Sequence, residues 1–257
     1  MSSDEIESIS RNAPTPGSGS RTDLFPITQW SAISRARSGD DSGATSGLRM
    51  LAVNYWRPLY LYLRKRGENH EDASDSVQGF FEFVFSSGFL SHVDREGGKF
   101  RSYLLRSLER WRTRQQVREG AQKRGGHIVH VPLDGIEEFR FASETSAEAS
   151  PEAAFDQQWA IDMVKRAVIS LRDDYSKRGR ENWFDTLRAA LPGGGQLPAY
   201  TELASQLDTS QGAIKKAVFD LRHAFGECLR DEIRATVRTN EDAEEELRYL
   251  VSVMGNR

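Results

Sequence analysis

Cysteine and long apolar runs are the scarcest features of this 257-residue sequence. Its single cysteine, Cys228, cannot form an intramolecular disulfide, which excludes the disulfide-stapled framework of many small secreted domains. No run of about 18 apolar residues occurs, which argues against a membrane-spanning helix. The acidic start MSSDEIESIS lacks the basic and apolar regions of a signal peptide. We therefore expect a cytoplasmic protein without membrane association.

Motifs for catalysis, metals and cofactors are also sparse. The only close pair among the five histidines, His127 and His130, has no flanking cysteine or carboxylate cluster at metal-ligand spacing. The glycine-rich stretches match neither a phosphate-binding loop nor a dinucleotide fingerprint. We expect no catalytic residue, no metal and no cofactor, so the chain is predicted not to be an enzyme. A small helical metal-dependent hydrolase built on the two histidines is the less favoured alternative.

Charges of both signs are present, but they are unevenly distributed. The formal net charge is only −3. Residues 99–124 nevertheless hold nine Lys or Arg against Glu109 and Glu119, whereas residues 127–156 carry a net charge of −6. A clustered basic segment attracts phosphate whatever the overall charge of the protein. This asymmetry is the first indication of a nucleic-acid partner.

Apolar residues recur at three- and four-residue steps, and no strand-like alternation extends beyond IVHV at 128–131. The pattern predicts an all-α fold of two small helical domains joined by a flexible acidic linker. Segments without apolar periodicity mark the tail and the linker. The predicted segments are a disordered N-terminal tail at 1–25, a first domain at 26–126, the linker at 127–154, a second domain at 155–235 and an acidic helical extension at 236–257.

The first domain begins with apolar periodicity over residues 29–66, interrupted by the polar loop at 38–47. This pattern predicts two helices. Pro58 lies inside the second and predicts a kink or a break there, because proline has no amide donor and clashes with the preceding turn. The helices expected after it are 71–85, with Asn69 as its N-cap, and 100–118.

The helix at 100–118 is predicted to have one packing face and one cationic face. Arg106 and Arg110 lie opposite the apolar residues, so they are predicted to be exposed. Tyr103 is interleaved with the arginines and is a candidate for stacking on an unpaired base. On a helical wheel, four apolar residues fall within about 80° of one another: Phe100, Leu104, Leu108 and Trp111.

The stretch YTELASQLDTSQGAIKKAV at 200–218 has the spacing of a helix-turn-helix. Small Ala204 allows two helices to cross closely, position 208 is the turn, and Ile214 is the apolar anchor of the second helix. Ser210 is its predicted N-cap. Residues predicted to lie on the exposed side are Gln211, Lys215, Lys216, Phe219 and His223. Phe219 is expected either to contact a thymine methyl or to pack against the C-terminal segment.

Taken together, these motifs resemble the extracytoplasmic-function type of bacterial RNA polymerase sigma factors. The resemblance extends over roughly residues 26–250. It rests on NYWRPLYLYLRKRG (54–67), EDASDSVQGFFEFVF (71–85), KFRSYLLRSLERW (99–111), KRGG (123–126) and YTELASQLDTSQGAIKKAV (200–218), which occur in the order of that family. It implies a first domain that binds the polymerase and melts the downstream promoter element, and a second domain that reads the upstream element.

Matched position by position, the resemblance implies three sets of contact residues. The polymerase-binding residues are Asp72, Asp75, Gln78 and Glu82, the downstream DNA-binding residues are Arg101, Tyr103, Arg106, Arg110 and Arg114, and the upstream DNA-binding residues are Ser210, Gln211, Lys215, Lys216 and Phe219. Two departures weaken the third set: Asp208 stands where a turn glycine is common, and Ala217 and Asp220 occupy positions that often hold arginine.

The function predicted from this resemblance is promoter-specific transcription initiation. The predicted partners are core RNA polymerase and promoter DNA, and the family leaves room for an anti-sigma factor or another regulator. The alternative within DNA-binding proteins is a helix-turn-helix regulator that acts without polymerase. The acidic helix at 71–85 followed by an Arg-rich helix favours the sigma factor, because a simple repressor needs neither.

Overall fold

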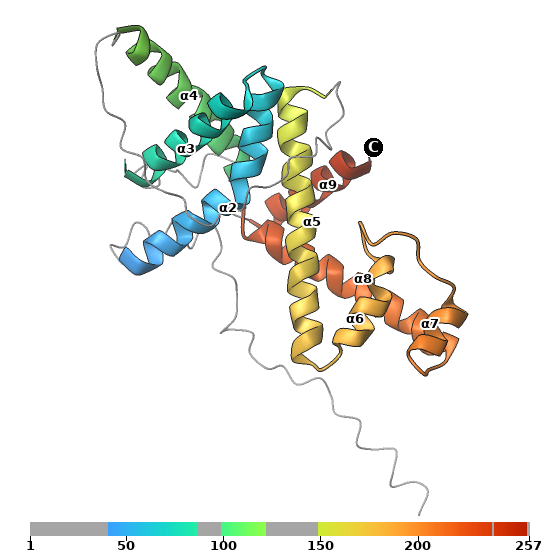
Figure 1. Cartoon of the computed structure of the whole chain (residues 1–257). Coiled ribbons are helices and arrows are strands. Elements are labelled where there is room, and N and C mark those ends of the chain that lie inside the picture. The colour runs from blue at the N-terminus through green and yellow to red at the C-terminus, as the bar shows by residue number, and fades with distance from the viewer. Residues whose placement is uncertain (1–40, 87–98, 122–148, 238, 256–257) are drawn as a thin grey trace, which may run out of the picture.

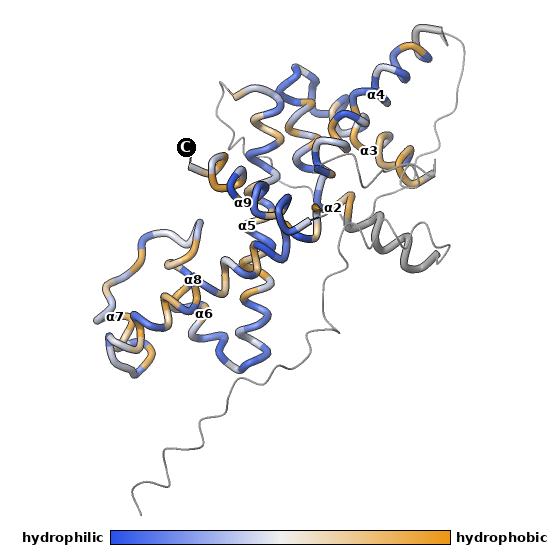
Figure 2. The backbone as a smooth tube through the Cα atoms, turned by 180° about the vertical axis from the view of Figure 1, so that it is seen from behind, coloured by the Kyte–Doolittle hydropathy of each residue, from blue (hydrophilic) through white to orange (hydrophobic). Residues whose placement is uncertain are grey.

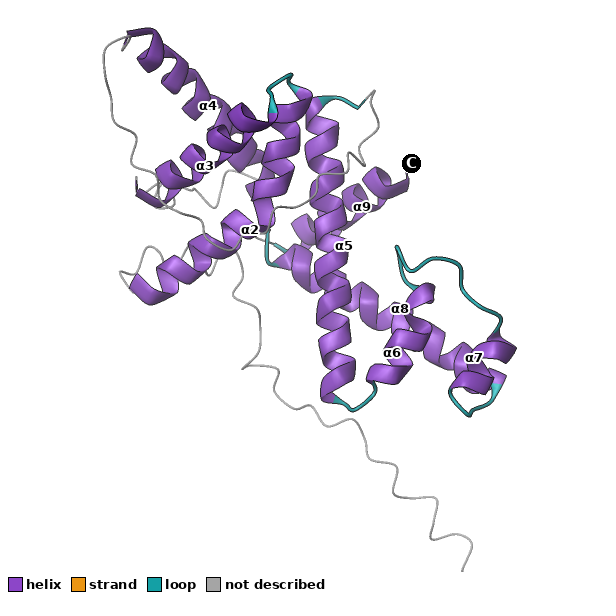
Figure 3. Ribbon diagram, viewed as in Figure 1, coloured by secondary structure: helices purple, strands orange, loops and turns teal. Residues whose placement is uncertain are grey.

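The computed structural model describes residues 41–86, 99–121, 149–237 and 239–255, and these residues form helices and connecting turns without strands (Figure 3). The all-α prediction is therefore confirmed for this part of the chain. The elements are α2 (Asp41–Lys65), α3 (His70–Ser86), α4 (Phe100–Ala121), α5 (Pro151–Lys177), α6 (Glu181–Leu187), the short 3₁₀ helix η3 (Arg188–Ala190), α7 (Tyr200–Gln206), α8 (Gln211–Arg234) and α9 (Asn240–Gly255).

Side-chain caps define where several helices begin. Asn69 Oδ1 accepts a 2.8 Å hydrogen bond from the Asp72 amide at the start of α3, as predicted. Ser150 Oγ accepts a 3.1 Å bond from the Ala153 amide at the start of α5. Thr239 Oγ1 accepts a 3.0 Å bond from the Asp242 amide at the start of α9. Each cap satisfies an amide that has no partner within its helix.

Helix α2 differs from the prediction for the first domain. It is one continuous helix from Asp41, so residues 41–47 of the predicted polar loop are helical. Pro58 lies inside it without breaking it. Figure 1 shows that α2 bends along its length, as the missing amide donor of a proline allows. Of the two predicted outcomes, the bend is observed and the break is not.

Most large apolar side chains gather in one main core cluster. It combines the buried faces of α2, α3 and α4 with the first half of α5, the end of α8 and α9. Burial of each large apolar side chain contributes roughly 1.5–3 kcal/mol. The members from the C-terminal half of the chain are Phe155, Trp159, Ala160, Met163, Val164, Ala167, Leu229, Ile233, Val237, Ala243 and Leu250. Helix α5 therefore packs against the helices of the predicted first domain (Figure 1).

A second, smaller cluster lies at the other end of α5. It joins the last turns of α5 to α6, η3, α7 and the first half of α8. Hydrophobic and hydrophilic stretches alternate along α5 and α8 (Figure 2), as expected for helices that bury one side. The buried members of the second cluster are Val168, Leu171, Phe184, Leu187, Leu191, Leu203, Ala204, Ile214, Val218 and Leu221.

These clusters change the predicted domain organisation. The boundary between the two cores runs across α5 and α8 and does not follow the predicted linker, so two separate domains are not confirmed. Residues 151–154, assigned to the linker, form the first turn of α5, because Ser150 caps the helix and Pro151 suits its first position. The tail at 1–25 and linker residues 127–148 lie outside the described residues. The predicted C-terminal helix is present as α9.

Within the described residues, no helix combines the length and apolar character needed to cross a bilayer.

Candidate nucleic-acid and partner interface

Helix α4 has the two faces that its sequence predicts. Phe100, Leu104 and Leu108 are at most 1% exposed and belong to the main core cluster. Three arginines of α4 are exposed and form no ion pair with the described residues: Arg106 and Arg110, on the side opposite the apolar residues, and Arg114, one turn after Arg110. We call these three residues the α4 arginine row. Tyr103 is half-buried and packs against the main core cluster.

Two acidic residues on or near α4, Glu109 and Glu68, are paired with cations outside the α4 arginine row. Glu109 forms an ion pair with Arg66 and accepts a 2.7 Å hydrogen bond from the Tyr62 hydroxyl. Glu68 forms an ion pair with Arg112. Burial raises the pKa of Glu68, and the Arg112 charge opposes that rise. These pairs leave the α4 arginine row as concentrated positive charge on the outer surface.

Arg101 was predicted to bind DNA with the other arginines of α4, but it does not belong to this exposed surface. The residue is only 9% exposed. Its Nε donates a 3.0 Å hydrogen bond to Glu246 Oε2 on α9, and its Nη1 pairs with Asp156 on α5. Burial lowers the pKa of the guanidinium, but the two carboxylates outweigh burial and raise it. Arg101 is thus a charged link between three helices.

Two aromatic rings complete this site, which we call the Arg101 cluster: Arg101, Asp156, Trp159, Glu246 and Tyr249. The Arg101 Cζ lies 4.9 Å from the Trp159 ring centroid and 4.4 Å from that of Tyr249. Such cation–π contacts gain strength when water is excluded. The Tyr249 hydroxyl donates a 2.6 Å hydrogen bond to Asp156 Oδ2. Burial, the larger cause, and this hydrogen bond, the next, raise the Tyr249 pKa to about 12, so the phenol stays protonated.

A signal for the position of Arg101 was present in the sequence. On a wheel of about 100° per residue, Arg101 lies about 20° from Leu108 and about 140° from Arg106. It therefore shares the packing side of α4. Lys99, the residue just before α4, is not among the predicted contact residues. Its Nζ is 3.1 Å from Glu246 Oε1 and 3.8 Å from Glu245 Oε1.

The four residues predicted to bind polymerase lie on α3. Asp72 and Asp75 are exposed, and Gln78 and Glu82 are half-buried. Gln78 Nε2 donates a 3.1 Å hydrogen bond to Glu82 Oε1. Their spacing of three and four residues places them along one side of the helix, opposite the apolar residues that enter the core. The side therefore offers a narrow acidic surface.

Helices α7 and α8 meet through a tight turn that matches the predicted spacing. Asp208 adopts φ 46°, the left-handed conformation that glycine, asparagine and aspartate tolerate best. Ala204 and Ile214 are buried in the second cluster. Ser210 Oγ accepts a 3.2 Å hydrogen bond from the Ala213 amide, so Ser210 is the N-cap of α8 as predicted. Aspartate thus replaces the turn glycine without loss of the turn.

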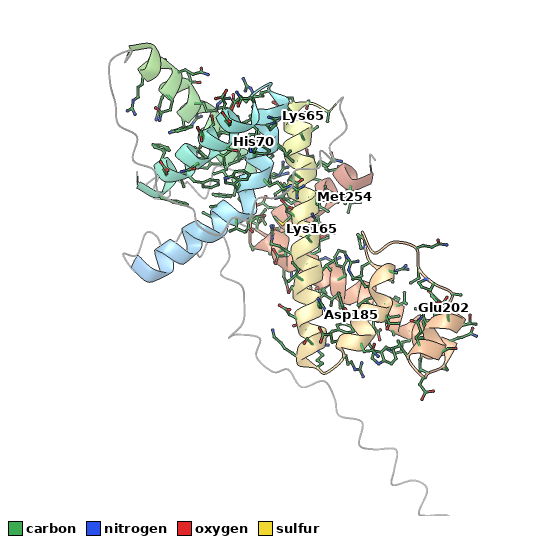
Figure 4. The ribbon with its side chains drawn as sticks, in the orientation of Figure 1. Lys65, His70, Lys165, Asp185, Glu202 and Met254 are labelled. Carbon is green, nitrogen blue, oxygen red and sulfur yellow. The ribbon has the colours of Figure 1, made fainter. Side chains whose placement is uncertain are left out.

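The residues predicted for the outer side of α8 are exposed. They are Gln211, Lys215, Lys216, Phe219 and His223. Phe219 is 68% exposed, so it does not pack against the C-terminal segment. Lys216 Nζ lies 2.6 Å from Asp220 Oδ2, whereas Lys215 has no ion pair within the described residues. Figure 4 places Glu202 on α7 well away from His70 at the start of α3, so this surface is distant from α3.

His127 and His130 are the two residues considered above for a metal site. His127 and His130 lie outside the described residues. Among the described residues, no group of three or more His, Cys, Asp or Glu is arranged to hold a metal ion.

Comparisons with known proteins give no relative. No family model, curated protein or solved structure matches the chain.

Proposed function

We propose that the chain is a sigma factor of the extracytoplasmic-function type, which binds core RNA polymerase and directs promoter-specific initiation. The observation that carries this proposal is the α4 arginine row. Arg106 and Arg110 are exposed opposite the buried side of the same helix, and Arg114, one turn later, is exposed too. Clustered arginines without carboxylate partners bind the phosphates of DNA and attract DNA from a distance.

The acidic side of α3 is the proposed polymerase contact. Asp72 and Asp75 project from a helix whose apolar face is already used by the core. Charged side chains at the rim of an interface direct association with a partner of opposite charge. A basic surface of the polymerase is therefore the expected partner of α3.

The proposed reader of the upstream promoter element is the outer side of α8. Lys215 is free to contact a phosphate, and the exposed Phe219 ring suits an apolar contact with a thymine methyl in the major groove. Lys216 must first release Asp220. An exposed i,i+4 pair is worth only about 0.3–0.5 kcal/mol, so phosphate displaces it readily.

The first test mixes the purified chain with core RNA polymerase and measures co-elution and run-off transcription from genomic fragments. Charge reversal of Asp75 and Glu82 to Arg should weaken binding to core polymerase without loss of helical content. Asp173→Arg, an exposed acidic position on α5, is the control and should bind normally. Unchanged affinity of the α3 variant would remove this contact. Specific DNA binding without any polymerase binding would favour the regulator that acts alone.

The second test concerns DNA. Arg106→Ala with Arg110→Ala should weaken promoter binding by the holoenzyme, and the slope of log K against log salt should fall by about one for each lost phosphate contact. Arg172→Ala is the control, because Arg172 is an exposed arginine on α5 that pairs with Glu181 on α6. A salt slope equal to that of the wild type would show that the α4 arginine row does not contact DNA phosphates.

The third test separates phosphate contacts from base contacts on α8. Replacement of Lys215 with Ala should weaken upstream-element binding uniformly across sequences. Phe219→Ala should change the preference at a single base pair, with a loss of about 1–3 kcal/mol there. If neither change alters the DNA footprint and initiation continues, α8 binds some surface other than the upstream promoter element.

A further inference from the structure

Helix α9 brings carboxylates to the N-terminal end of α4. Lys99 precedes α4, and its ammonium lies 3.1 Å from Glu246 and 3.8 Å from Glu245 on α9. Arg106, the first member of the α4 arginine row, follows Lys99 by about two helical turns, or roughly 10 Å along the axis. Two cations at this end of α4, Lys99 and Arg101, are therefore occupied by α9.

The Arg101 cluster fixes α9 in this position. Glu246 is only 1% exposed, and Arg101 donates to both of its oxygens, at 3.0 and 3.4 Å. Tyr249, one turn later, covers the Arg101 guanidinium and bonds to Asp156. The same helix buries Ala243 and Leu250 in the main core cluster. One face of α9 thus combines an apolar contact with a specific ionic contact.

Holding a helix in place with a buried ion pair has a large desolvation cost. Removing a carboxylate and a guanidinium from water costs several kcal/mol each, so apolar residues of similar size often hold as well or better. What a buried ion pair adds is selectivity, because an alternative partner must supply matching charge and geometry. A phosphate group presents the same sign of charge and the same oxygen acceptors to Lys99 and Arg101 as Glu246 does.

We propose that α9 is an acidic latch that competes with nucleic-acid phosphate for Lys99 and Arg101 at the N-terminal end of α4. The proposal rests on the proposed function only in taking α4 as a DNA-binding helix. In the latched state, Glu245 and Glu246 neutralise Lys99, and the Arg101 cluster holds α9 against α4 and α5. DNA that follows the arginine row toward Lys99 displaces these carboxylates, and α9 leaves its place.

Binding of the full-length chain to a fluorescently labelled DNA duplex, measured by anisotropy at several salt concentrations, tests this latch. Glu245→Gln removes one exposed contact to Lys99 and should tighten binding about twofold. Glu246→Gln also weakens the Arg101 cluster and should tighten binding about fivefold or more. Glu244→Gln is the matched control, because Glu244 lies on the same helix and faces Arg230 instead of Lys99. Its affinity should equal that of the wild type.

Hydrogen exchange of the α9 amides reports the latch directly. Addition of the duplex to the wild-type chain should accelerate exchange in α9, and Glu246→Gln should accelerate it without DNA. If Glu246→Gln lowers the amount of folded protein, Glu245→Gln decides the question, because Glu245 is 61% exposed and contributes little to the core. Unchanged affinity for both variants, together with unchanged exchange in α9, would overturn the latch.

The same assay distinguishes failure of the latch from failure of the proposed function. In the Glu246→Gln background, Arg106→Ala with Arg110→Ala should abolish the gain in affinity. If these arginine changes weaken DNA binding while the glutamine variants do nothing, the arginine row binds DNA and the latch is wrong. If the arginine changes have no effect on DNA binding, the DNA-binding role of α4 is wrong, and the latch falls with it.

Discussion

Replacing Arg101 with Met is the sharpest test of the tertiary structure, because it removes the shared partner of two carboxylates. The Arg101 side chain is 10% exposed, against 1% for Glu246 and 15% for Asp156. Breaking a buried pair by removing one partner costs about 3–5 kcal/mol when the remaining charge is left alone. Here Glu246 keeps Lys99 at 3.1 Å and Asp156 keeps the Tyr249 hydroxyl at 2.6 Å. We therefore expect a loss of about 2–3 kcal/mol.

The loss is measured as the free energy of unfolding in urea, followed by circular dichroism. Arg106→Met is the control, because Arg106 is an exposed arginine on the same helix, and its effect should stay within about 0.5 kcal/mol. Glu246→Gln and the double variant complete a mutant cycle. Because Arg101 and Glu246 share hydrogen bonds, their effects should depart from additivity by about 1 kcal/mol or more.

Two results would refute this reasoning. A loss below about 1 kcal/mol for Arg101→Met would mean that the guanidinium is not an essential partner of the buried carboxylates. Additive effects of the Arg101 and Glu246 changes would mean that the two side chains do not interact in solution, and hence that α9 does not dock on α4 as described.

Three further changes have defined outcomes. Burial raises the folded-state pKa of Asp162, so the charged form of this side chain destabilises the fold. Asp162→Asn should therefore raise the melting temperature at pH 7. The gain should disappear as the pH falls through the raised pKa toward the ordinary value of 3.8. Asp208→Val should cost about 1–2 kcal/mol in urea unfolding, because a β-branched residue resists φ 46°, whereas Asp208→Gly should cost nothing. Gly194→Ala should lower stability by about 1–3 kcal/mol in thermal unfolding, because its Cβ would overlap the Arg188 carbonyl oxygen. Normal stability of this variant would show that the loop differs in solution.

Local features of the fold followed from the sequence. The periodicity of α3 and α4 identified which side of each helix enters the core, and Asn69 and Ser210 identified where α3 and α8 begin. Such features depend on residues within one or two turns of each other, so short-range chemistry is sufficient. The exposure of Arg106 and Arg110 followed in the same way from the apolar residues on the opposite side of α4.

The candidate site was only partly predictable. The positions of Lys215 and Phe219 on α8 followed from helical spacing, and their exposure agrees with it. The resemblance to sigma factors predicts Arg101 as a DNA-binding residue, although its own position on the helical wheel puts it on the packing side of α4. The start of α5 was missed by a few residues because Ala-rich, acidic residues obscured the Ser150 cap followed by Pro151.

By itself, the sequence determined that the described chain is helical, where most helices lie and which of their sides are apolar. Tertiary structure alone decided that α5, α8 and α9 share a core with α2, α3 and α4. It also decided that Arg101 meets Glu246, a residue 145 positions away. The physical reason is that periodicity reports one face of one helix, whereas the partner of that face depends on how all the helices pack together in space.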